Sequence, residues 1–355
     1  MLSPFPLTGK IKNLMEPDFL SPILGAVEGV QISDLVTPGH SGSLHKKLIV
    51  TLSGGKTISL VMKTIHPEMD VTIRRTGALY TREALLLDSR ALDDIWNFFE
   101  SPYIAYAKEE TSAALLMHDL SDYIVPDKRE PVTIEQETDF ISLLAKFHVR
   151  YLGSPVLNHP WLTSEVSYFR MFGPYTWPEE NIAGHMRPLY EMVGEGWNFA
   201  RTILPSKIQE LLWKPAINLV SILDGLPRTL IHGDSKVGNF AFMPSHKIAA
   251  FDWSLIGAAP SSCEIGWYLA VNATRLARSK EDVLKLYRSV FESELGQQLT
   301  ETSWSRFKSA GILSGSLSML WKKALNVKQN LPGAQDEWNW WEKELDKCRV
   351  DFFSK

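Results

Sequence analysis

The segment Leu230-Ile-His-Gly-Asp-Ser-Lys-Val-Gly-Asn-Phe240 decides the fold, together with Ala250-Phe-Asp-Trp-Ser254 downstream. Each segment begins as a short apolar run typical of a strand and ends in polar residues. Asp234 and Asn239 stand five residues apart in the first segment, and Asp252 follows Asn239 by thirteen residues. We therefore expect three oxygen-bearing side chains on loops at the ends of neighbouring strands.

These three side chains suit a magnesium and phosphate site. Asn239 and Asp252 offer the oxygen ligands that Mg²⁺ prefers, and substrate phosphates complete the coordination of this ion. Asp234 adds a carboxylate that can hold a hydroxyl for in-line attack on phosphorus. The alternative interpretation is a polar loop in which the same residues only cap turns.

The pattern His-x-Asp-x4-Asn over residues 232–239, followed by Asp252, resembles the catalytic signature of the aminoglycoside phosphotransferase and choline kinase-like family. Members of this family share the protein-kinase fold. The resemblance implies that Asp234 is the catalytic base and that Asn239 and Asp252 bind magnesium.

Two positions close to these motifs, one within the first motif and one after Asp252, differ from the family's usual pattern. Lys236 matches a position at which Ser/Thr protein kinases carry a phosphate-contacting lysine, whereas small-molecule kinases of this family often carry histidine there. Lys236 is the second expected catalytic residue. Glu264 stands where the family often has an aspartate that opens the next helix, and its longer side chain is expected to brace the catalytic loop with a different reach.

The N-terminal part offers the lysine and the glutamate that a kinase fold needs. Lys63 lies in Leu60-Val-Met-Lys-Thr-Ile65, which resembles the Val-Ala-Ile-Lys strand of kinases, and Glu83 follows on the next helix. The resemblance implies a Lys63–Glu83 ion pair that aims the ammonium at the α- and β-phosphates of a nucleotide. The alternative interpretation is that Lys63 is a solvated lysine on a strand and Glu83 is an ordinary surface glutamate.

Two further segments are expected to contact the nucleotide. A loop between the first two strands would cover the phosphates with its backbone N–H groups and hydroxyls, although it lacks a full Gly-x-Gly-x-x-Gly pattern. The run 113–120 resembles the hinge between kinase lobes, where backbone groups meet the adenine edge, although its aspartate could instead cap a turn. The residues expected to bind the nucleotide here are Gly39, Ser41, Gly42, Ser43, Met117 and Asp119.

Hydrophobic patterning predicts an α+β protein with two lobes. The expected first lobe, residues 1–120, binds the nucleotide and holds strands at 30–36, 48–52, 57–65, 103–108 and 113–117 and a helix over 71–91. The expected second lobe, residues 121–355, is mainly helical, with helices at 135–151, 188–203, 206–223 and 280–295. It also contains the catalytic loop, the substrate pocket and a small hairpin formed by the runs at 229–231 and 248–251.

Composition excludes several other classes of protein. The 355 residues carry a net charge of −4, which gives no reason to expect nucleic-acid binding. The only two cysteines, Cys263 and Cys348, are 85 residues apart, so no thiolate zinc site is expected. Without a signal-peptide pattern or an apolar run of about 18 residues, we expect no membrane span and a cytoplasmic location.

The resemblance implies a small-molecule kinase that uses ATP and Mg²⁺ to phosphorylate a hydroxyl. The segment Gly257-Ala-Ala-Pro260 is too short for a regulated activation loop, which disfavours a protein kinase. Alternatives are a kinase-fold pseudoenzyme that binds nucleotide without turnover and, less favoured, a metal-dependent hydrolase. Neither the acceptor nor the oligomeric state follows from the sequence. The tryptophan-rich, acidic segment 336–342 either lines a pocket for a cationic acceptor or packs on the helical lobe.

Overall fold

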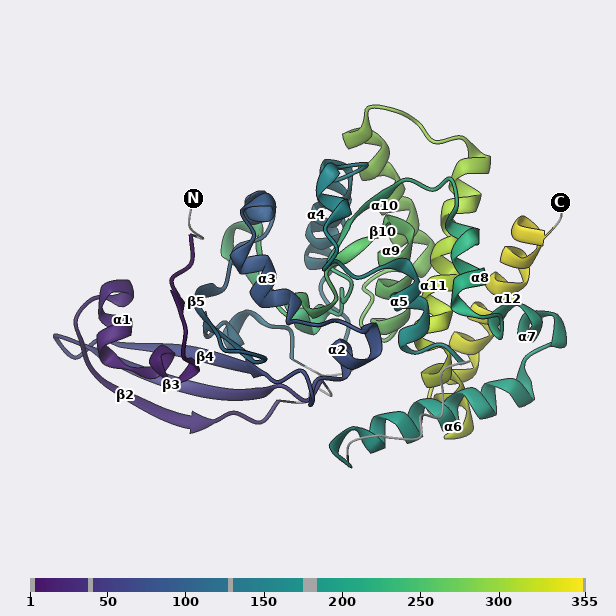
Figure 1. Cartoon of the computed structure of the whole chain (residues 1–355). Coiled ribbons are helices and arrows are strands. Elements are labelled where there is room, and N and C mark those ends of the chain that lie inside the picture. Colours follow the sequence, from purple (N-terminus) through teal and green to yellow (C-terminus); the bar gives the residue numbers. More distant parts are fainter. Residues whose placement is uncertain (1–3, 38–40, 127–129, 175–183, 354–355) are drawn as a thin grey trace. The chain divides into compact units, whose positions relative to one another are not determined.

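A six-stranded sheet forms the centre of the first of two units in the computed structural model (Figure 1). The structure describes residues 4–37, 41–126, 130–174 and 184–353. The first unit comprises Met1–Ile124 and Phe240–Ser254, and the second comprises Val125–Asn239 and Leu255–Lys355.

The strand order in this sheet is β1-β5-β6-β4-β3-β2. Only β1 pairs in parallel, with β5, and all other neighbours are antiparallel. The strands are β1 (Leu7–Thr8), β2 (Val27–Asp34), β3 (Leu44–Leu52), β4 (Thr57–Ile65), β5 (Tyr103–Lys108) and β6 (Ala113–His118). One face buries alternate apolar residues against the short helix α1 (Pro17–Leu24), among them Leu48, Val50, Leu60 and Met62. Neither α1 nor β1 was predicted from the sequence.

The prediction of a single helix over residues 71–91 is wrong. The chain instead forms α2 (Val71–Thr76) and α3 (Arg82–Asp88), followed by a 3-10 segment at Arg90–Asn97. The break occurs at Gly77, which adopts a left-handed conformation with φ of 67° and caps α2. This interruption gives α3 its own start, one residue before Glu83.

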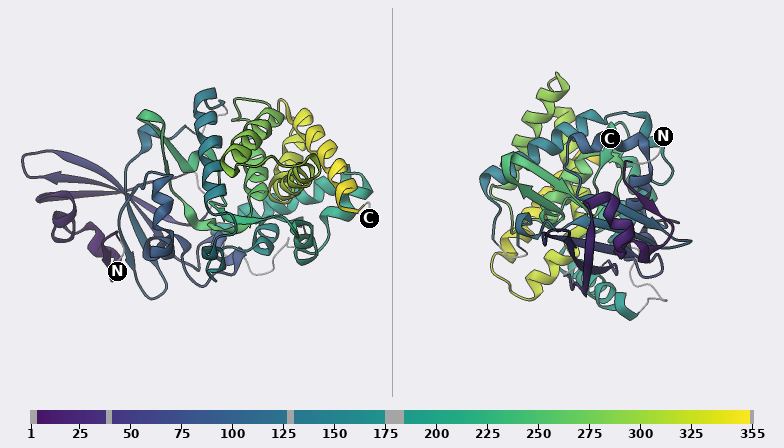
Figure 2. Two further views of the ribbon diagram at one scale, coloured as in Figure 1. Left: turned by 90° about the horizontal axis from the view of Figure 1, so that it is seen from above. Right: turned by 90° about the vertical axis from the view of Figure 1, so that its left-hand side faces the viewer.

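The second unit is mainly helical, and its long helix α11 (Glu301–Lys328) packs against α6 (Arg187–Ile203), α9 (Ser261–Val271) and α12 (Ala334–Phe353) (Figures 1 and 2). The other helices are α4 (Ile134–Arg150), α5 (Glu165–Met171), α7 (Ser206–Leu212), α8 (Ala216–Val220) and α10 (Lys280–Leu295). The helix expected over 206–223 is interrupted at Pro215, which precedes α8. Among the helices in the described segments, none is both long and apolar enough to cross a membrane.

The small hairpin expected from 229–231 and 248–251 is also wrong in its pairing. β7 (Arg228–Ile231) pairs with β10 (Gly257–Pro260), and β9 (Lys247–Ala250) pairs with β8 (Phe240–Met243). The β8–β9 hairpin belongs to the first unit, where Phe240 packs near Phe99 and Ala249 bridges to Glu100. The lobe boundary expected at residue 120 places the same residues in the second lobe.

Candidate active site

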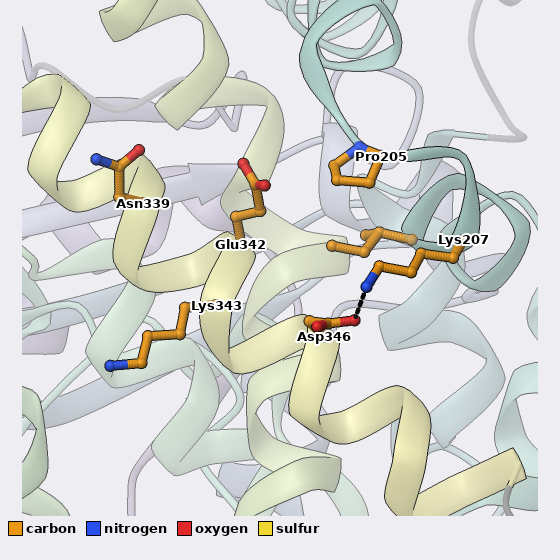
Figure 3. A pocket seen from close by; sticks show the side chains of 7 residues that line it. Pro205, Lys207, Asn339, Glu342, Lys343 and Asp346 are labelled. Carbon is orange, nitrogen blue, oxygen red and sulfur yellow. Dashed lines mark ion pairs between the residues drawn. The ribbon is translucent and has the colours of Figure 1, made fainter.

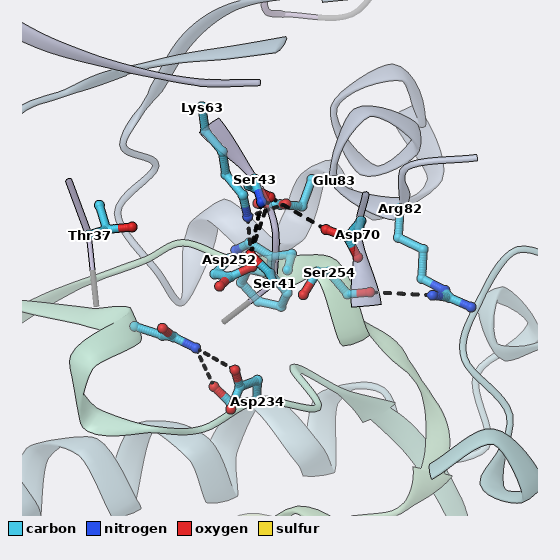
Figure 4. Close-up of polar contacts among 12 residues, drawn as sticks. Thr37, Ser41, Ser43, Lys63, Asp70, Arg82, Glu83, Asp234, Asp252 and Ser254 are labelled. Atoms are coloured by element: carbon cyan, nitrogen blue, oxygen red, sulfur yellow. Dashed lines mark hydrogen bonds and ion pairs between the residues drawn. The ribbon is translucent and has the colours of Figure 1, made fainter. Parts of the chain in front are cut away.

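Lys63 and Glu83 form a buried ion pair in the first unit (Figure 4). β4 carries Lys63 and α3 carries Glu83, and the Nζ atom lies 2.7 Å from Oε2 of the glutamate. The hydroxyl of Tyr103 donates to the other carboxylate oxygen at 3.3 Å. Lys63 is 4% exposed and Glu83 1% exposed, so neither is a solvated surface residue. The expected pair is therefore present, with Tyr103 as a partner that the sequence did not reveal.

A second carboxylate, that of Asp252, also contacts Lys63. The Lys63 Nζ atom lies 2.8 Å from Oδ1 of Asp252. Asp252 has a left-handed backbone with φ of 59°, which is unfavourable for a residue with a side chain. Trp253 next to it is fully buried beside Phe99 and donates its indole N–H to the carbonyl of Ala250. This anchor holds Asp252 in its strained conformation.

The charges of this cluster affect one another strongly. Burial alone would lower the pKa of Lys63, but Asp252 and Glu83 outweigh it and raise the pKa above its ordinary value. Burial raises the pKa of Glu83 to about 7, against the opposing effect of Lys63 and with support from Asp252. The raised pKa of Lys63 favours its charged form, whereas burial, the largest effect on the pKa of Glu83, favours the neutral form of that carboxyl.

The loop expected to cover the phosphates is tied to the start of α2. Gly39 lies outside the described residues. The carbonyl of Ser41 accepts the N–H of the first residue of α2 at 2.9 Å, and the Ser43 hydroxyl lies 3.4 Å from the Asp70 carboxylate. Gly42 between them has a φ of 89°, a conformation that favours glycine. Asp70, the N-cap of α2, was not predicted, although an aspartate before a short apolar run is a typical helix start.

The hinge residues Met117 and Asp119 lie at the end of β6. The N–H group of His118 donates to the Pro102 carbonyl at 2.9 Å, and that of Asp119 donates to the Ser59 carbonyl at 3.1 Å. The Asp119 carboxylate accepts from the Ser59 hydroxyl at 2.7 Å and pairs with a lysine of β3. Two backbone donors of this segment are thus used within the lobe. A role of Met117 and Asp119 in adenine binding stays a prediction, and it would need other backbone groups.

The loop after β7 places Asp234 and Asn239 in direct contact in the second unit (Figure 4 shows the two hydrogen bonds to Asp234). Asn239 donates from Nδ2 to the Asp234 carbonyl at 3.0 Å and to Oδ2 of its carboxylate at 2.9 Å. Trp267 of α9 donates its indole N–H to Oδ1 at 2.9 Å. Each carboxylate oxygen of Asp234 therefore has a donor. Trp267 was not predicted, because no local pattern links residues 33 positions apart.

Glu264 braces the same loop, as expected for the position of this residue. Its Oε2 accepts the N–H of His232 at 3.0 Å, and its Oε1 accepts the N–H of Gly233 at 2.9 Å. The Nε2 atom of His148 lies 2.9 Å from Oε2, and Nδ1 of the same ring lies 2.9 Å from the Tyr287 hydroxyl. All these groups are buried, so the contacts hold the backbone of the loop without competition from water.

Lys236 directly precedes the 3-10 turn Val237–Asn239, and its carbonyl accepts the Asn239 N–H at 2.9 Å. Its side chain is half-buried, and within the described part of the chain its ammonium forms no ion pair. The resemblance implies a contact between this ammonium and a phosphate. That role of Lys236 stays a prediction.

Solved structures with a similar fold include small-molecule kinases. The ethanolamine kinase of Plasmodium vivax matches with a TM-score of 0.50 and 12% identity, over 95% of this chain and 84% of that chain. The chain has the fold of a small-molecule kinase. The choline kinase of Streptococcus pneumoniae matches with a TM-score of 0.45 and 13% identity, over 93% of this chain and 96% of that chain. A spectinomycin phosphotransferase, in complex with ADP and spectinomycin, matches with a TM-score of 0.47 and 10% identity, over 97% and 98% of the two chains.

Neither a protein-family model nor a curated protein sequence matches the chain. The kinase-like α+β fold is therefore detected through structure, in agreement with the class predicted from the sequence.

The residues expected to hold magnesium have suitable chemistry. The Asn239 amide uses its nitrogen to donate to Asp234, which leaves its oxygen as the atom suited to a cation. The Asp252 side chain is 29% exposed, so its carboxylate is open to solvent and ligand. No group of three or more His, Cys, Asp or Glu side chains able to bind a metal occurs among the described residues. Each of the two side chains offers oxygen of the kind that Mg²⁺ prefers, and their role in binding it stays a prediction.

The tryptophan-rich segment of this kinase-like chain packs within the helical unit. Trp338 and Trp341 of α12 are almost fully buried. Glu337 pairs with Lys280 at 2.5 Å and with Lys323 at 3.1 Å, so its charge is already balanced. Lys280 also lies over the ring of the neighbouring Trp340. Of the two interpretations of this segment, the structure favours packing over a pocket for a cationic acceptor.

A surface pocket of about 300 Å³ lies between α7 and α12 (Figure 3). Lys207 and Asp346 form an ion pair of 2.7 Å at its edge. Its lining residues are Pro205, Lys207, Ile208, Asn339, Glu342, Lys343 and Asp346. Two of them, Asn339 and Glu342, belong to the segment 336–342, and none is among the residues expected to bind the nucleotide, to bind magnesium or to act in catalysis.

Proposed function

We propose that this chain transfers the γ-phosphoryl group of ATP to a hydroxyl of a small molecule. The observation that carries the proposal is the buried pair of Lys63 and Glu83, with the partly exposed Asp252 as a second partner of the ammonium, in a chain with the fold of an ethanolamine kinase. Burying the charges of Lys63 and Glu83 costs free energy that their mutual attraction does not reliably offset. A fixed ammonium able to meet a polyphosphate gives such a cluster a use.

In the proposal, Lys63 neutralises charge on the nucleotide phosphates, and Glu83 holds its ammonium in place. Asn239 and Asp252 hold Mg²⁺, which when bound supplies further neutralisation of the phosphate charge. Lys236 contacts the transferred group. The loop with Gly39, Ser41, Gly42 and Ser43 covers the phosphates, and the hinge at Met117 and Asp119 receives the adenine base.

Asp234 orients the acceptor hydroxyl and takes its proton late in the transfer. Its carboxylate is held by Asn239, and Glu264 fixes the backbone of the two residues before it. Such positioning supplies most of the rate enhancement in phosphoryl transfer. The ethanolamine kinase with the same fold makes ethanolamine the first acceptor to test, followed by choline and spectinomycin.

The Asp234→Asn variant tests the proposal. We expect phosphoryl transfer from radiolabelled ATP to fall about 100-fold or more, because a general base contributes about 10² to 10⁴ in rate. The dissociation constant of the magnesium–nucleotide complex should stay within about twofold of the wild-type value. Asp336→Asn, which removes an exposed carboxylate at the start of α12, is the matched control and should leave both quantities unchanged. Equal turnover by the Asp234→Asn variant and the wild type would exclude Asp234 as the base.

A further inference from the structure

The helix α9 holds three successive residues of the catalytic loop. Glu264 in its first turn accepts the N–H groups of His232 and Gly233. Trp267, three residues later, donates its indole N–H to Oδ1 of Asp234 at 2.9 Å. Residues three apart lie on the same face of a helix, so one face of α9 contacts both the backbone and the reactive side chain of the loop.

Close packing fixes the position of α9 itself. A Cβ atom built on Gly266 would lie 1.9 Å from the Gly311 carbonyl oxygen of α11, so the two helix backbones touch. The Trp267 ring stacks on Phe172 with 6.3 Å between ring centroids and 12° between ring planes. Stacking on Phe172 therefore holds the Trp267 ring in place, and the indole N–H of this ring donates to Asp234.

The two donors on Asp234 come from different elements and meet different oxygens. Asn239 donates to Oδ2 from within the loop, and Trp267 donates to Oδ1 from α9. The Cβ–Cγ torsion of an aspartate is broad, so a hydrogen bond to one oxygen restricts the carboxylate less than hydrogen bonds to both oxygens. With both donors, one orientation is selected.

We propose that Trp267 is a positioning residue for phosphoryl transfer, because its indole N–H fixes the carboxylate of Asp234 in the orientation that accepts the hydroxyl proton. This inference rests on the proposed function. It assigns no contact between Trp267 and the substrate. The residue acts through Asp234, and a loss of the N–H group should lower kcat while leaving nucleotide binding intact.

The contact itself is tested without an activity assay. The chain has twelve tryptophans, whose indole N–H groups give separate signals in a ¹H–¹⁵N spectrum of uniformly labelled protein. The signal that Trp267→Phe removes identifies Trp267. In the Asp234→Asn variant, which replaces the charged acceptor by a neutral one, that signal should move upfield because the hydrogen bond weakens. An unchanged Trp267 signal in Asp234→Asn would overturn the inference.

The kinetic role is tested with Trp267→Phe, which keeps an aromatic ring against Phe172 and removes the donor. We expect kcat for ATP-dependent phosphorylation of the best acceptor to fall about tenfold or more, with the nucleotide KM unchanged. Trp340→Phe on α12 is the matched control, because it removes a comparable hydrogen bond from an indole N–H group to a carboxylate, that of Glu281. Its kcat should equal the wild-type value.

The outcomes separate the inference from the proposed function. If the wild type phosphorylates no acceptor, the proposed function fails, and the spectrum still reports whether Trp267 contacts Asp234. If the wild type is active and Trp267→Phe retains the kcat of Trp340→Phe, the positioning role is wrong while the kinase function stands. If Trp267→Phe lowers the unfolding temperature and raises the nucleotide KM together with its effect on kcat, the residue is only structural and the inference fails.

Discussion

The buried ammonium of Lys63 has two carboxylate partners, and removing it would leave both without their cation. We expect Lys63→Met to lower the free energy of unfolding by about 3 kcal/mol or more at pH 8, since a buried charge without its partner is strongly destabilising. Urea unfolding measures the change. Lys46→Met, which breaks an exposed pair with Asp34 on the adjacent strands, is the control and should change the free energy of unfolding far less, because solvent screens exposed ion pairs. Similar losses in the two variants would show that burial of the cluster does not matter.

The pKa of Glu83 predicts a pH dependence of stability. Burial raises this pKa to about 7, compared with an ordinary value of 4.5. The folded state therefore binds a proton that the unfolded state has lost between these values, so stability from this group is fully present below pH 4.5 and is lost as the pH rises to 7. We expect Glu83→Gln to remove this decline, worth on the order of 3 kcal/mol. Urea unfolding at pH 5, 6, 7 and 8 measures this decline. If the free energy of unfolding changed with pH in parallel for the variant and the wild type, the raised pKa of Glu83 would be contradicted.

At the scale of elements, the contact between α9 and α11 determines where the catalytic loop is held. Gly266→Ala places a methyl group against the Gly311 carbonyl, so we expect the free energy of unfolding to fall by about 2 kcal/mol or more. Gly194→Ala on α6 is the control, because open space surrounds that position and alanine favours a helix by up to about 1 kcal/mol. The two substitutions should thus change stability in opposite directions. A neutral effect of Gly266→Ala in chemical denaturation would show that the helices can separate without cost.

The elements that local pattern determines were predictable. β4 and β5 match the expected ranges 57–65 and 103–108, because runs of β-branched or aromatic residues are bounded there by turn residues. α10 likewise matches its expected range of 280–295. The four-residue strands were harder, since β8 and β10 have too few residues for a periodic signal and their partners are set by tertiary packing.

At the scale of the whole molecule, the order of motifs along the chain was the strongest sequence signal for the fold. Lysine, glutamate, hinge, catalytic loop and metal aspartate appear in the order that a kinase fold requires. The supporting residues Tyr103 and Trp267 were not predictable, because they act through contacts between distant segments. The sequence also left open what segment 336–342 does, and in the structure Trp338, Trp341 and Glu337 of this segment serve helix packing.

The most direct test of the central claim is the stability of the full chain with and without magnesium and ATP. At an ATP concentration of about 100 times the dissociation constant, we expect the wild type to gain about 2.7 kcal/mol in free energy of unfolding. The gain should require Mg²⁺ and should be lost in Asp252→Ala, which removes a proposed magnesium ligand that also contacts Lys63. A wild type with no gain at saturating magnesium–ATP, or an Asp252→Ala variant with the full gain, would contradict the account.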